Sequence, residues 1–365
     1  MPHTNGRPTQ RQIAAKVGVS VATVSRILNP DEAHPERWAS PLTVAAIQAA
    51  AAQLGYRRNA LAVSLRTSHS KTVGIMMPLV GDYVLSTIYD GIDQVARQHD
   101  MMTILTCALD EPALRAERTS TMLDHQVAGM IFGDARLDDE FLDSINTRGV
   151  PFTLVHRRHN NHVSVTADDV TAGRLAAQHL IDLGRRRLAI ISGERFVPAW
   201  RDREQGFMTA VAEAGLPAPV LVETGFDVAA SRDAALRMME RPPYPDGVFA
   251  VHDSTALGTI SVLRQYGLHV PDDVAVIGFY NTPMSMATDL TSIDVDLMQM
   301  GRRSIQLLLD RLGGKEITSE VVPVSLAVRH STDPSQPLGT NLAVTKLHKS
   351  HGPRCGPPYA TVSSS

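Results

Sequence analysis

The chain has few cysteines and no long apolar run. Cys107 and Cys355 are the only cysteines among 365 residues, and two isolated cysteines support neither a disulfide framework nor a metal site. Because no apolar run approaches 18 residues, no membrane-spanning helix and no membrane partner are expected. The opening MPHTNGRPTQ lacks the apolar stretch of a signal peptide. The sequence therefore predicts a protein of the cytoplasm.

Sequence motifs that are typical of enzymes are also missing. The chain contains no GxGxxG dinucleotide fingerprint, no GxxxxGK[ST] phosphate loop, no GxSxG nucleophile elbow and no HExxH zinc motif. HRRHNNH at 156–162 looks like a metal cluster, but it follows a predicted strand in a loop without a cysteine or acidic ligand. We therefore predict no catalytic residues, no metal and no cofactor.

Charge is distributed unevenly along the chain. Residues 1–70 hold eight lysines and arginines but only three acidic residues, a net charge of +5, whereas the whole chain carries −3. Residues 71–365 therefore carry −8. A basic head on an acidic body predicts that affinity for phosphate groups lies at the N-terminal end.

Residues 9–29, TQRQIAAKVGVSVATVSRILN, predict two short helices joined by a tight turn. Thr9 and Gln12 have the spacing of a capping box, and Gly18 suits the left-handed conformation that ends a helix. Ser20 is then in place to cap a second helix. The apolar residues that give this helix its inner face are Val24, Ile27 and Leu28.

The outer face of the second helix combines small, hydroxyl and basic residues. Its members are Val21, Ala22, Thr23, Ser25 and Arg26. Such a helix can lie in a DNA groove, where the hydroxyl groups of Ser20, Thr23 and Ser25 can hold phosphates. Arg26 can reach a guanine edge or a phosphate, and Val21 and Ala22 can pack on a thymine methyl. The alternative, an ordinary helical hairpin in a core, does not need serine, threonine and arginine together on this face.

A third helix and a short connector complete the head. NPDEAHPERWAS reads as a loop, after which Ser40 and Pro41 begin a helix that ends at Gly55. In the connector, ALAVSL can form one or two helical turns, which are too short to persist in water without a partner. We therefore expect a DNA-binding domain at 1–56 and a hinge at 57–70.

From residue 71 onward, strands and helices alternate, which is the pattern of βαβ units and a parallel sheet. The expected strands are 72–80, 101–107, 127–133, 150–155, 187–193, 219–223, 246–253, 273–279 and a last pair within 321–329. The expected helices are 86–100, 112–126, 139–149, 170–184, 200–215, 228–240, 254–267 and 298–314.

So many strands favour two sheets over one, and hence two similar α/β subdomains with a cleft between them. The first subdomain is expected at about 71–167 and 296–322, and the second at about 168–295 and 323–331. Together they form an effector-binding and dimerisation domain at 71–331. Residues 332–365 are rich in Pro, Gly, Ser and His, and are expected to form a disordered tail.

From about Thr9 to Thr332, the chain resembles the lactose-repressor family of bacterial transcription regulators. VGVSVATVSRILN matches the family's helix-turn-helix signature and NALAVSLRT resembles its hinge. The body repeats the family's landmarks DDVTAG, HLIDLGRRRLAIISG, RDREQGF, HDSTALG, LRQYGLHVPDDVAVIGF and LTSID. The resemblance implies an all-α helix-turn-helix head and a periplasmic-binding-protein-like body of two doubly wound parallel-sheet subdomains.

The resemblance also implies a function. The protein would be a repressor that binds a roughly palindromic operator as a homodimer, under the control of a small effector in the cleft, a sugar or related metabolite. Matched to the family's hinge, Leu65 would be a wedge that enters the minor groove and kinks the duplex, with Asn59 at the family spacing. The alternative is that Leu65 packs on the body.

Strand ends predict the effector site, because clefts of this kind hold ligands at the carboxyl ends of strands from both subdomains. The candidates at strand ends are Asp82, Tyr83, His156, Arg157, His252 and Tyr280. Trp200 could stack on a sugar ring, and Arg203 matches the arginine with which the family's RxxGF motif contacts ligand. The alternatives are a surface salt bridge for Arg203 and a structural role for His252, with Asp253 capping the helix that begins at Ser254.

Several positions depart from the family pattern. The loop before the third helix is a few residues longer, and Arg58 and Val63 stand where the hinge usually has Pro and Arg. Tyr280 replaces a carboxylate that binds sugar hydroxyls. With two histidines and two arginines around the cleft, an aromatic or anionic ligand fits at least as well as a neutral hexose.

Two other classes of protein compete with this interpretation. One is a sugar or nucleotide enzyme with an accessory DNA-binding head, and the other is a small-molecule-binding protein, either cytoplasmic or of the transport type. Turnover of a metabolite would favour the enzyme, whereas a sequence-specific gel shift would favour the regulator. Because residues 333–365 show no leucine heptads, a dimer is expected in preference to a tetramer.

Overall fold

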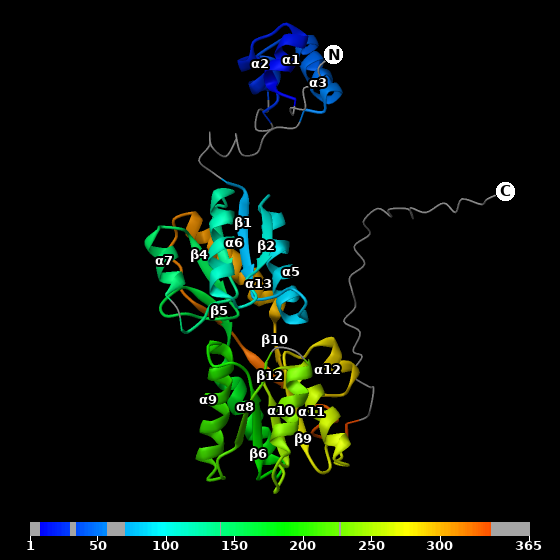
Figure 1. Ribbon diagram of the computed structural model, residues 1–365. Helices are drawn as coiled ribbons and strands as arrows, with labels where there is room; N and C mark the ends of the chain where they lie inside the picture. The colour runs from blue at the N-terminus through cyan, green and yellow to red at the C-terminus, as the bar shows by residue number, and fades with distance from the viewer. Residues whose placement is uncertain (1–7, 30–33, 57–69, 139, 226–227, 337–365) are drawn as a thin grey trace, which may run out of the picture. The chain divides into compact units, whose positions relative to one another are not determined.

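The computed structural model describes residues 8–29, 34–56, 70–138, 140–225 and 228–336 (Figure 1). The chain divides into two compact units, with the boundary in the sequence between residues 71 and 72, and we call them the head and the body. The head is all helical and the body is α/β, so the predicted fold class is confirmed. None of the described helices combines the length and apolar character that a membrane crossing needs.

The head contains helices α1 (Gln10–Val17), α2 (Val21–Ile27) and α3 (Pro41–Leu54), with a 3-10 turn η1 at Pro35–Arg37 that the sequence did not predict. The Thr9 amide donates to Gln12 Oε1 over 2.7 Å, and both halves of the predicted capping box are present. Gly18 ends α1 with φ at 74°, and Ser20 and Ser40 cap the next two helices as predicted. The core of the head is made of Ile13, Ala14, Val24, Ile27, Ile47, Ala50 and Ala51.

The hinge lies outside the described residues. Asn59 and Leu65, the two residues singled out there, belong to residues 57–69, which the structure does not describe. Their roles at the operator stay predictions.

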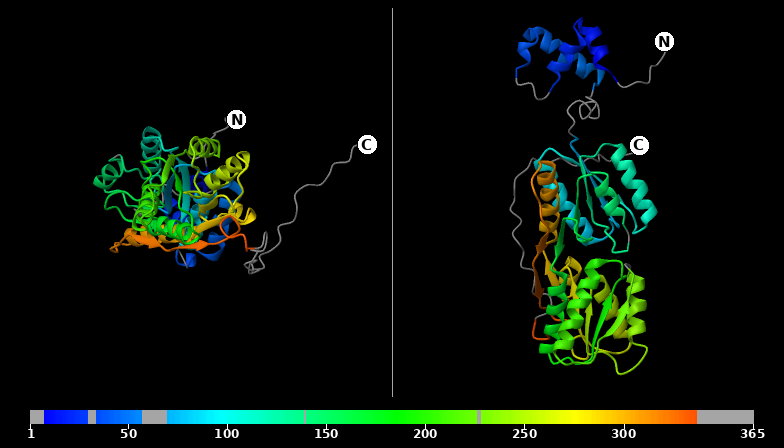
Figure 2. Two further views of the ribbon diagram at one scale, coloured as in Figure 1. Left: turned by 90° about the horizontal axis from the view of Figure 1, so that it is seen from below. Right: turned by 90° about the vertical axis from the view of Figure 1, so that its left-hand side faces the viewer.

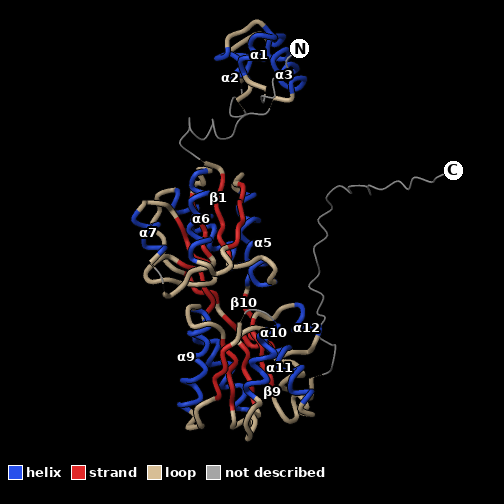
Figure 3. The backbone as a smooth tube through the Cα atoms, viewed as in Figure 1, coloured by secondary structure: helices blue, strands red, loops and turns tan. Residues whose placement is uncertain are grey.

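The first lobe of the body is a six-stranded sheet in the order β11-β5-β4-β3-β1-β2, with every pair parallel. Its strands are β1 (Thr72–Met77), β2 (Met102–Cys107), β3 (Gly129–Phe132), β4 (Phe152–Val155), β5 (Ser164–Ala167) and β11 (Glu320–Val322). Its helices are α5 (Tyr83–Gln98), α6 (Pro112–Asp124), α7 (Phe141–Thr147) and α13 (Leu297–Leu312). Figure 3 shows the strands enclosed by helices.

The second lobe repeats this plan with the order β12-β10-β9-β8-β6-β7, in which only the β10–β12 pair is antiparallel. Its strands are β6 (Leu188–Ser192), β7 (Val220–Glu223), β8 (Gly247–Ala250), β9 (Ala275–Phe279), β10 (Thr291–Val295) and β12 (Val324–Ala327). Its helices are α8 (Asp169–Asp182), α9 (Pro198–Glu213), α10 (Val228–Met238), α11 (Asp253–Gln265) and α12 (Pro283–Ala287). Figure 2 shows the two lobes of the body end to end.

The chain passes between the lobes three times: after β5, after β10, and between β11 and β12. Both β5 and β10 were left unassigned in the prediction from the sequence. The last strand pair predicted within 321–329 corresponds to β11 and β12, which lie in different sheets on the two sides of the predicted subdomain boundary between 322 and 323. Thr332, assigned to the tail from the sequence, packs into the second lobe. It is buried, and its hydroxyl lies 2.7 Å from Thr291 Oγ1 and 2.9 Å from His179 Nε2. Residues 337–365 of the predicted tail are outside the described part.

Candidate functional site

The outer face of α2 is the first candidate site. Val21, Ala22 and Arg26 are exposed on it, whereas Thr23 and Ser25 are half-buried. Ser20 Oγ accepts the Thr23 amide over 3.0 Å and lies 2.8 Å from Thr23 Oγ1. Two of the hydroxyl groups predicted to hold phosphate therefore already bond to each other and to the start of the helix, although a hydroxyl oxygen can accept more than one hydrogen bond.

The Arg26 side chain lies against an aromatic ring from the next loop. Its guanidinium carbon is 4.0 Å from the centre of the Trp38 ring. Arg26 thus combines exposure with an ordered cation–π contact.

The second candidate site is a cavity of about 360 Å³ in the body. Polar residues line it from both lobes, and the predicted carboxyl ends of β1, β4, β8 and β9 contribute to it. It includes six of the candidates: Asp82, His156, Arg157, Trp200, His252 and Tyr280. Apolar side chains make up much of the remainder: Pro78, Leu79, Val84, Leu85, Val197 and Val251. An apolar cavity with a few convergent polar groups is typical of a small-molecule site.

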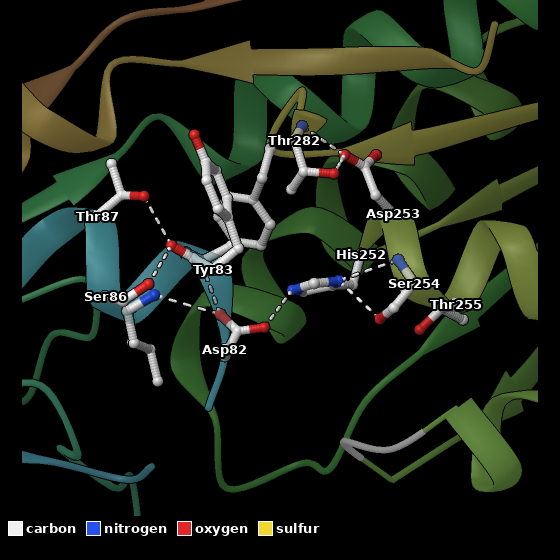
Figure 4. Close-up of polar contacts among 12 residues, drawn as sticks. Asp82, Tyr83, Ser86, Thr87, His252, Asp253, Ser254, Thr255 and Thr282 are labelled. Carbon is white, nitrogen blue, oxygen red and sulfur yellow. Dashed lines mark hydrogen bonds and ion pairs between the residues drawn. The ribbon is translucent and has the colours of Figure 1, made fainter. Parts of the chain in front are cut away.

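Asp82 and His252 form a bridge between the lobes. Figure 4 shows the His252 ring between Asp82 and Ser254. His252 Nδ1 accepts the Ser254 amide over 3.2 Å, so Nε2 carries the ring proton and faces Asp82 Oδ2 at 3.3 Å. Burial opposes ionisation of Asp82, but the hydrogen bond from His252 and two backbone amides lower its pKa. The cavity therefore presents an ionised carboxylate at neutral pH.

His156 and Tyr280 form a second bridge. The Tyr280 hydroxyl accepts a 2.7 Å hydrogen bond from Arg203 Nη2 and lies 2.7 Å from His156 Nε2, to which it donates. Burial, followed by the charges of Arg157 and Arg203, lowers the pKa of His156 to about 3, so this imidazole is neutral. Both bridging residues have positive φ, 68° for His156 and 95° for Tyr280, and such strained backbone clusters at functional sites.

Arg203, which was predicted to contact the ligand, is not among the residues that line the cavity. It is 1% exposed and lies behind Tyr280. Its Nε donates to Asp169 Oδ1 and its Nη1 to the Val251 carbonyl, each over 2.7 Å. Burial raises the pKa of Asp169 to about 6 although the charge of Arg203 opposes this, so the pair is ionic at neutral pH. The alternative of a surface salt bridge is wrong, because the Arg203–Asp169 pair is buried. In this structure Arg203 supports the Tyr280 hydroxyl.

Arg157 lines the cavity, but its charge is neutralised. Its Nη1 and Nη2 donate to the two Asp110 carboxylate oxygens over 2.6 and 3.1 Å, and it is 1% exposed. With Arg203 paired to Asp169 and His156 neutral, the cavity offers an anion no uncompensated cation among these residues. The expectation that an anionic ligand fits as well as a neutral one therefore loses its basis.

Trp200 covers part of the cavity and depends on a glycine beneath it. Trp200 is 6% exposed. A Cβ built on Gly193 would lie 1.5 Å from Trp200 Cε3, so only glycine allows the indole to lie at the end of β6.

One prediction about a neighbouring residue was wrong. The side chain that caps α11 is His252 rather than Asp253. Asp253 is buried and accepts the Thr282 amide and hydroxyl, each over 2.8 Å, and the Ser292 hydroxyl over 2.7 Å. Tyr83, which was also predicted to contact the effector, is 47% exposed and lies outside the residues that line the cavity; its role stays a prediction.

Thr224, Ser254 and Thr255 also line the cavity and were not predicted from the sequence. Thr224 directly follows β7 and is buried, so the strand-end rule would have found it.

Two wider hollows, of about 610 and 900 Å³, lie elsewhere on the body. The first is lined mainly by charged and polar side chains that form surface ion pairs, such as Arg158 with Asp202 at 2.8 Å. In the second, His162 Nε2 lies 2.6 Å from Asp143. Neither hollow gathers buried polar groups from both lobes, so the smaller cavity is the candidate ligand site.

Comparison with protein families gives two matches along the chain. Residues 9–59 match the family described as bacterial regulatory proteins, lacI family. Residues 177–332 match a periplasmic binding protein-like domain.

Characterised relatives align over nearly their whole length. The HTH-type transcriptional regulator CelR of Thermobifida fusca is 32% identical over 341 residues, which cover 89% of this chain and 98% of the relative. Catabolite control protein A of Priestia megaterium is 29% identical over 329 residues, with coverages of 88% and 98%. The transcriptional repressor CytR of Escherichia coli K12 is 28% identical over 335 residues, with coverages of 89% and 96%.

Solved structures share the fold. A complex of the transcriptional regulator CelR with cellobiose superposes with a TM-score of 0.68 at 28% identity, covering 89% of this chain and all of that one. The lac repressor dimer bound to operator and an anti-inducer superposes with a TM-score of 0.80 at 23% identity, with coverages of 90% and 99%. At that identity the second likeness concerns the fold alone.

Proposed function

This chain belongs to the lacI family of bacterial regulatory proteins, and on that premise we propose how it works as a transcriptional regulator. It binds a roughly palindromic operator as a homodimer in the cytoplasm, acts as a repressor, and is controlled by a small effector in the body cleft. This proposal rests on the presence of two features in one chain. The head has an exposed arginine on a capped two-helix motif, and the body has a cavity that polar side chains from two lobes bridge.

In the head, we propose that the outer face of α2 recognises the base sequence of the operator. Arg26 reaches a guanine edge or a neighbouring phosphate, and Val21 and Ala22 pack against thymine methyl groups. Ser20, Thr23 and Ser25 contact phosphates and set the register. Asn59 and Leu65 extend the interface into the minor groove, as the family's hinge implies.

In the body, we infer that the effector is an uncharged molecule with several hydroxyl groups, such as a sugar or glycoside. The Asp82 carboxylate and the His252 ring can exchange hydrogen bonds with hydroxyl groups, and Trp200 can cover an apolar ring face. An anionic ligand would be repelled by the Asp82 carboxylate. Arg157 would not compensate for this, because its charge is already paired with Asp110. The sugar in the CelR–cellobiose complex supports this class.

The test starts from the purified full-length chain. Operator duplexes are selected from a random-sequence pool, and a panel of neutral sugars, glycosides, nucleosides and sugar phosphates is then screened by thermal shift and for release of the selected duplex. We expect a palindromic consensus and a hit among the uncharged compounds. Failure to enrich any sequence would refute the regulator, and a hit confined to the sugar phosphates would refute the uncharged effector.

We propose that the cleft binds its effector without converting it. The same screen distinguishes the two classes, because chromatography of each hit after long incubation shows whether the compound is recovered unchanged. Turnover would support an enzyme with an accessory DNA-binding head.

A further inference from the structure

The loop between α2 and α3 presents an exposed tryptophan to the arginine of the α2 face. The Arg26 guanidinium lies 4.0 Å from the centre of the Trp38 ring, and Trp38 is 42% exposed. A tryptophan left this exposed forgoes part of the free energy that burying its large ring would supply. The ring thus lies beside a surface cation rather than in the head core.

The backbone on both sides of Trp38 is fixed by hydrogen bonds. The Arg37 and Trp38 amides donate to the carbonyls of His34 and Pro35, each over 3.1 Å, and close the 3-10 turn. Two residues later, Ser40 accepts the Thr43 amide and caps α3. Trp38 is therefore held between a turn and a helix start, which limits where its ring can lie.

Arg26 remains available to a partner despite this contact. Its side chain is exposed, and within the described part of the chain no residue forms an ion pair or hydrogen bond with its guanidinium. A stacked guanidinium is contacted on its flat face, so the N–H donors at its edge stay free to form paired hydrogen bonds.

We propose that Trp38 is a positioning residue of the DNA interface, which holds the Arg26 guanidinium in place before DNA arrives. The inference rests on the proposed function, in which Arg26 contacts the operator. An arginine that is free in solution loses side-chain entropy when DNA fixes it, and a stack formed beforehand removes part of that cost. Cation–π contacts at exposed sites correspond to a factor of about 2 to 5 in an equilibrium constant.

The experiment compares four full-length variants on a duplex selected by the wild-type protein: W38A, W38F, R26A and the R26A/W38A double variant. We expect W38A to weaken binding about 2- to 5-fold and W38F, which keeps an aromatic face, to bind nearly as the wild type does. In the R26A background, W38A should have no further effect. Base preference in W38A should relax at the same half-site position as in R26A.

Controls separate positioning from folding. Thermal unfolding and affinity for a scrambled duplex report whether the head of each variant is intact. If W38A unfolds the head, W38F supplies the spectroscopic readout, since the chain has only two tryptophans. Subtracting the emission of W38F, which keeps Trp200, isolates Trp38. That signal should change on adding the selected duplex, and the change should be smaller in R26A.

The outcomes distinguish this inference from the proposed function. The positioning role is wrong, and the regulator stands, if R26A weakens DNA binding but W38A does not. The same holds if adding W38A weakens DNA binding by the same factor in the wild type and in R26A. A Trp38 emission that the duplex leaves unchanged also overturns the role. If R26A binds the selected duplex as the wild type does, the proposed contact of Arg26 itself fails.

Discussion

At the scale of single residues, the cleft depends on the hydroxyl group of Tyr280. This hydroxyl joins a chain of hydrogen bonds from Asp169 through Arg203 to Tyr280 and on to His156 in the other lobe. The ring itself is 3% exposed. A phenol here therefore connects the lobes, where a carboxylate would have added a second buried negative charge near Asp169.

Tyr280→Phe should keep the ring and remove this link. We expect a loss of about 1–3 kcal/mol in the free energy of unfolding, because Arg203 Nη2 loses a buried acceptor. The effector concentration that gives half-maximal release of DNA should also change, since the lobes lose one of the two side-chain bridges that line the cavity. Denaturant unfolding and effector titration measure the two effects.

A matched control is Tyr244→Phe, because no described residue hydrogen bonds to the Tyr244 hydroxyl, and the residue is half-buried. Its stability and effector response should equal those of the wild type. If Tyr280→Phe behaves as this control does, the bridge has no energetic role.

The neutral ring of His156 predicts a specific dependence of stability on pH. Its pKa is about 3 in the folded chain, below the ordinary value near 6.5. Between these values the unfolded chain binds a proton that the folded chain does not, so stability falls as pH falls from about 6.5 toward 3, by up to about 1.4 kcal/mol per unit.

Replacing His156 with Asn should remove this contribution. The difference in free energy of unfolding between wild type and His156→Asn should then be constant above pH 7. At lower pH the wild type should lose stability relative to His156→Asn, as measured by urea unfolding at a series of pH values. Parallel curves for the two proteins throughout would show that the imidazole is not held neutral. Because Arg157, Arg203 and Asp82 face it, each must remain unchanged in the comparison.

The residues of the cleft could be predicted from the sequence only where they follow the end of a predicted strand. Asp82, His156, His252 and Tyr280 follow strand ends, and the carboxyl ends of parallel strands meet at one edge. The pairing of each charge could not be predicted in this way. Asp169 and Asp110 neutralise Arg203 and Arg157 from 34 and 47 residues away along the chain, so their contacts depend on the complete fold.

At the scale of elements, each lobe contains one helix crossing that only glycine permits. A Cβ built on Gly206 in α9 would lie 2.0 Å from the Val170 carbonyl oxygen of α8, and one on Gly301 in α13 would lie 2.0 Å from the Ile88 carbonyl oxygen of α5. Because the clashing atoms are backbone, the helices themselves would have to move apart.

Gly206→Ala should therefore destabilise the second lobe by about 1–3 kcal/mol or more. It should also weaken effector binding, since α9 carries both Arg203 and Trp200. Gly313→Ala is the control, because the atoms nearest its added Cβ lie at 3.4 and 3.5 Å with ordinary backbone φ. Thermal unfolding and effector titration test both variants, and equal behaviour of the two would contradict the close crossing.

Helices of the head could be predicted because their signals are local. Thr9, Ser20 and Ser40 cap helices within three residues of their own positions. The strands β5 and β10 were missed for the opposite reason: SVTA and TSIDV are polar in sequence yet largely buried. Their hydroxyl groups are satisfied by distant partners, such as Asp253 for Ser292 and Arg329 for Thr291, so their polarity concealed their place in the core.

At the scale of the whole molecule, the alternation of strands and helices predicted the two-lobed body, and the charge difference predicted which end meets DNA. Regulation needs one further property, which is that the effector must bind two arrangements of the lobes unequally. The bridges Asp82–His252 and His156–Tyr280 hold the arrangement seen here. An effector that inserts its hydroxyl groups between Asp82 and His252 replaces one bridge and so changes the balance between arrangements.

The coupling between effector binding and operator binding must be reciprocal. If the effector changes operator affinity by a factor of about 5 to 150, typical of allosteric coupling, saturating operator must change effector affinity by the same factor. Titrating the effector by calorimetry, with and without the selected duplex, measures one side of the cycle, and titrating the duplex with and without effector measures the other. A scrambled duplex at the same concentration is the control. Equal effector affinity with and without operator would contradict allosteric control, because a ligand indifferent to the DNA-bound arrangement cannot shift it.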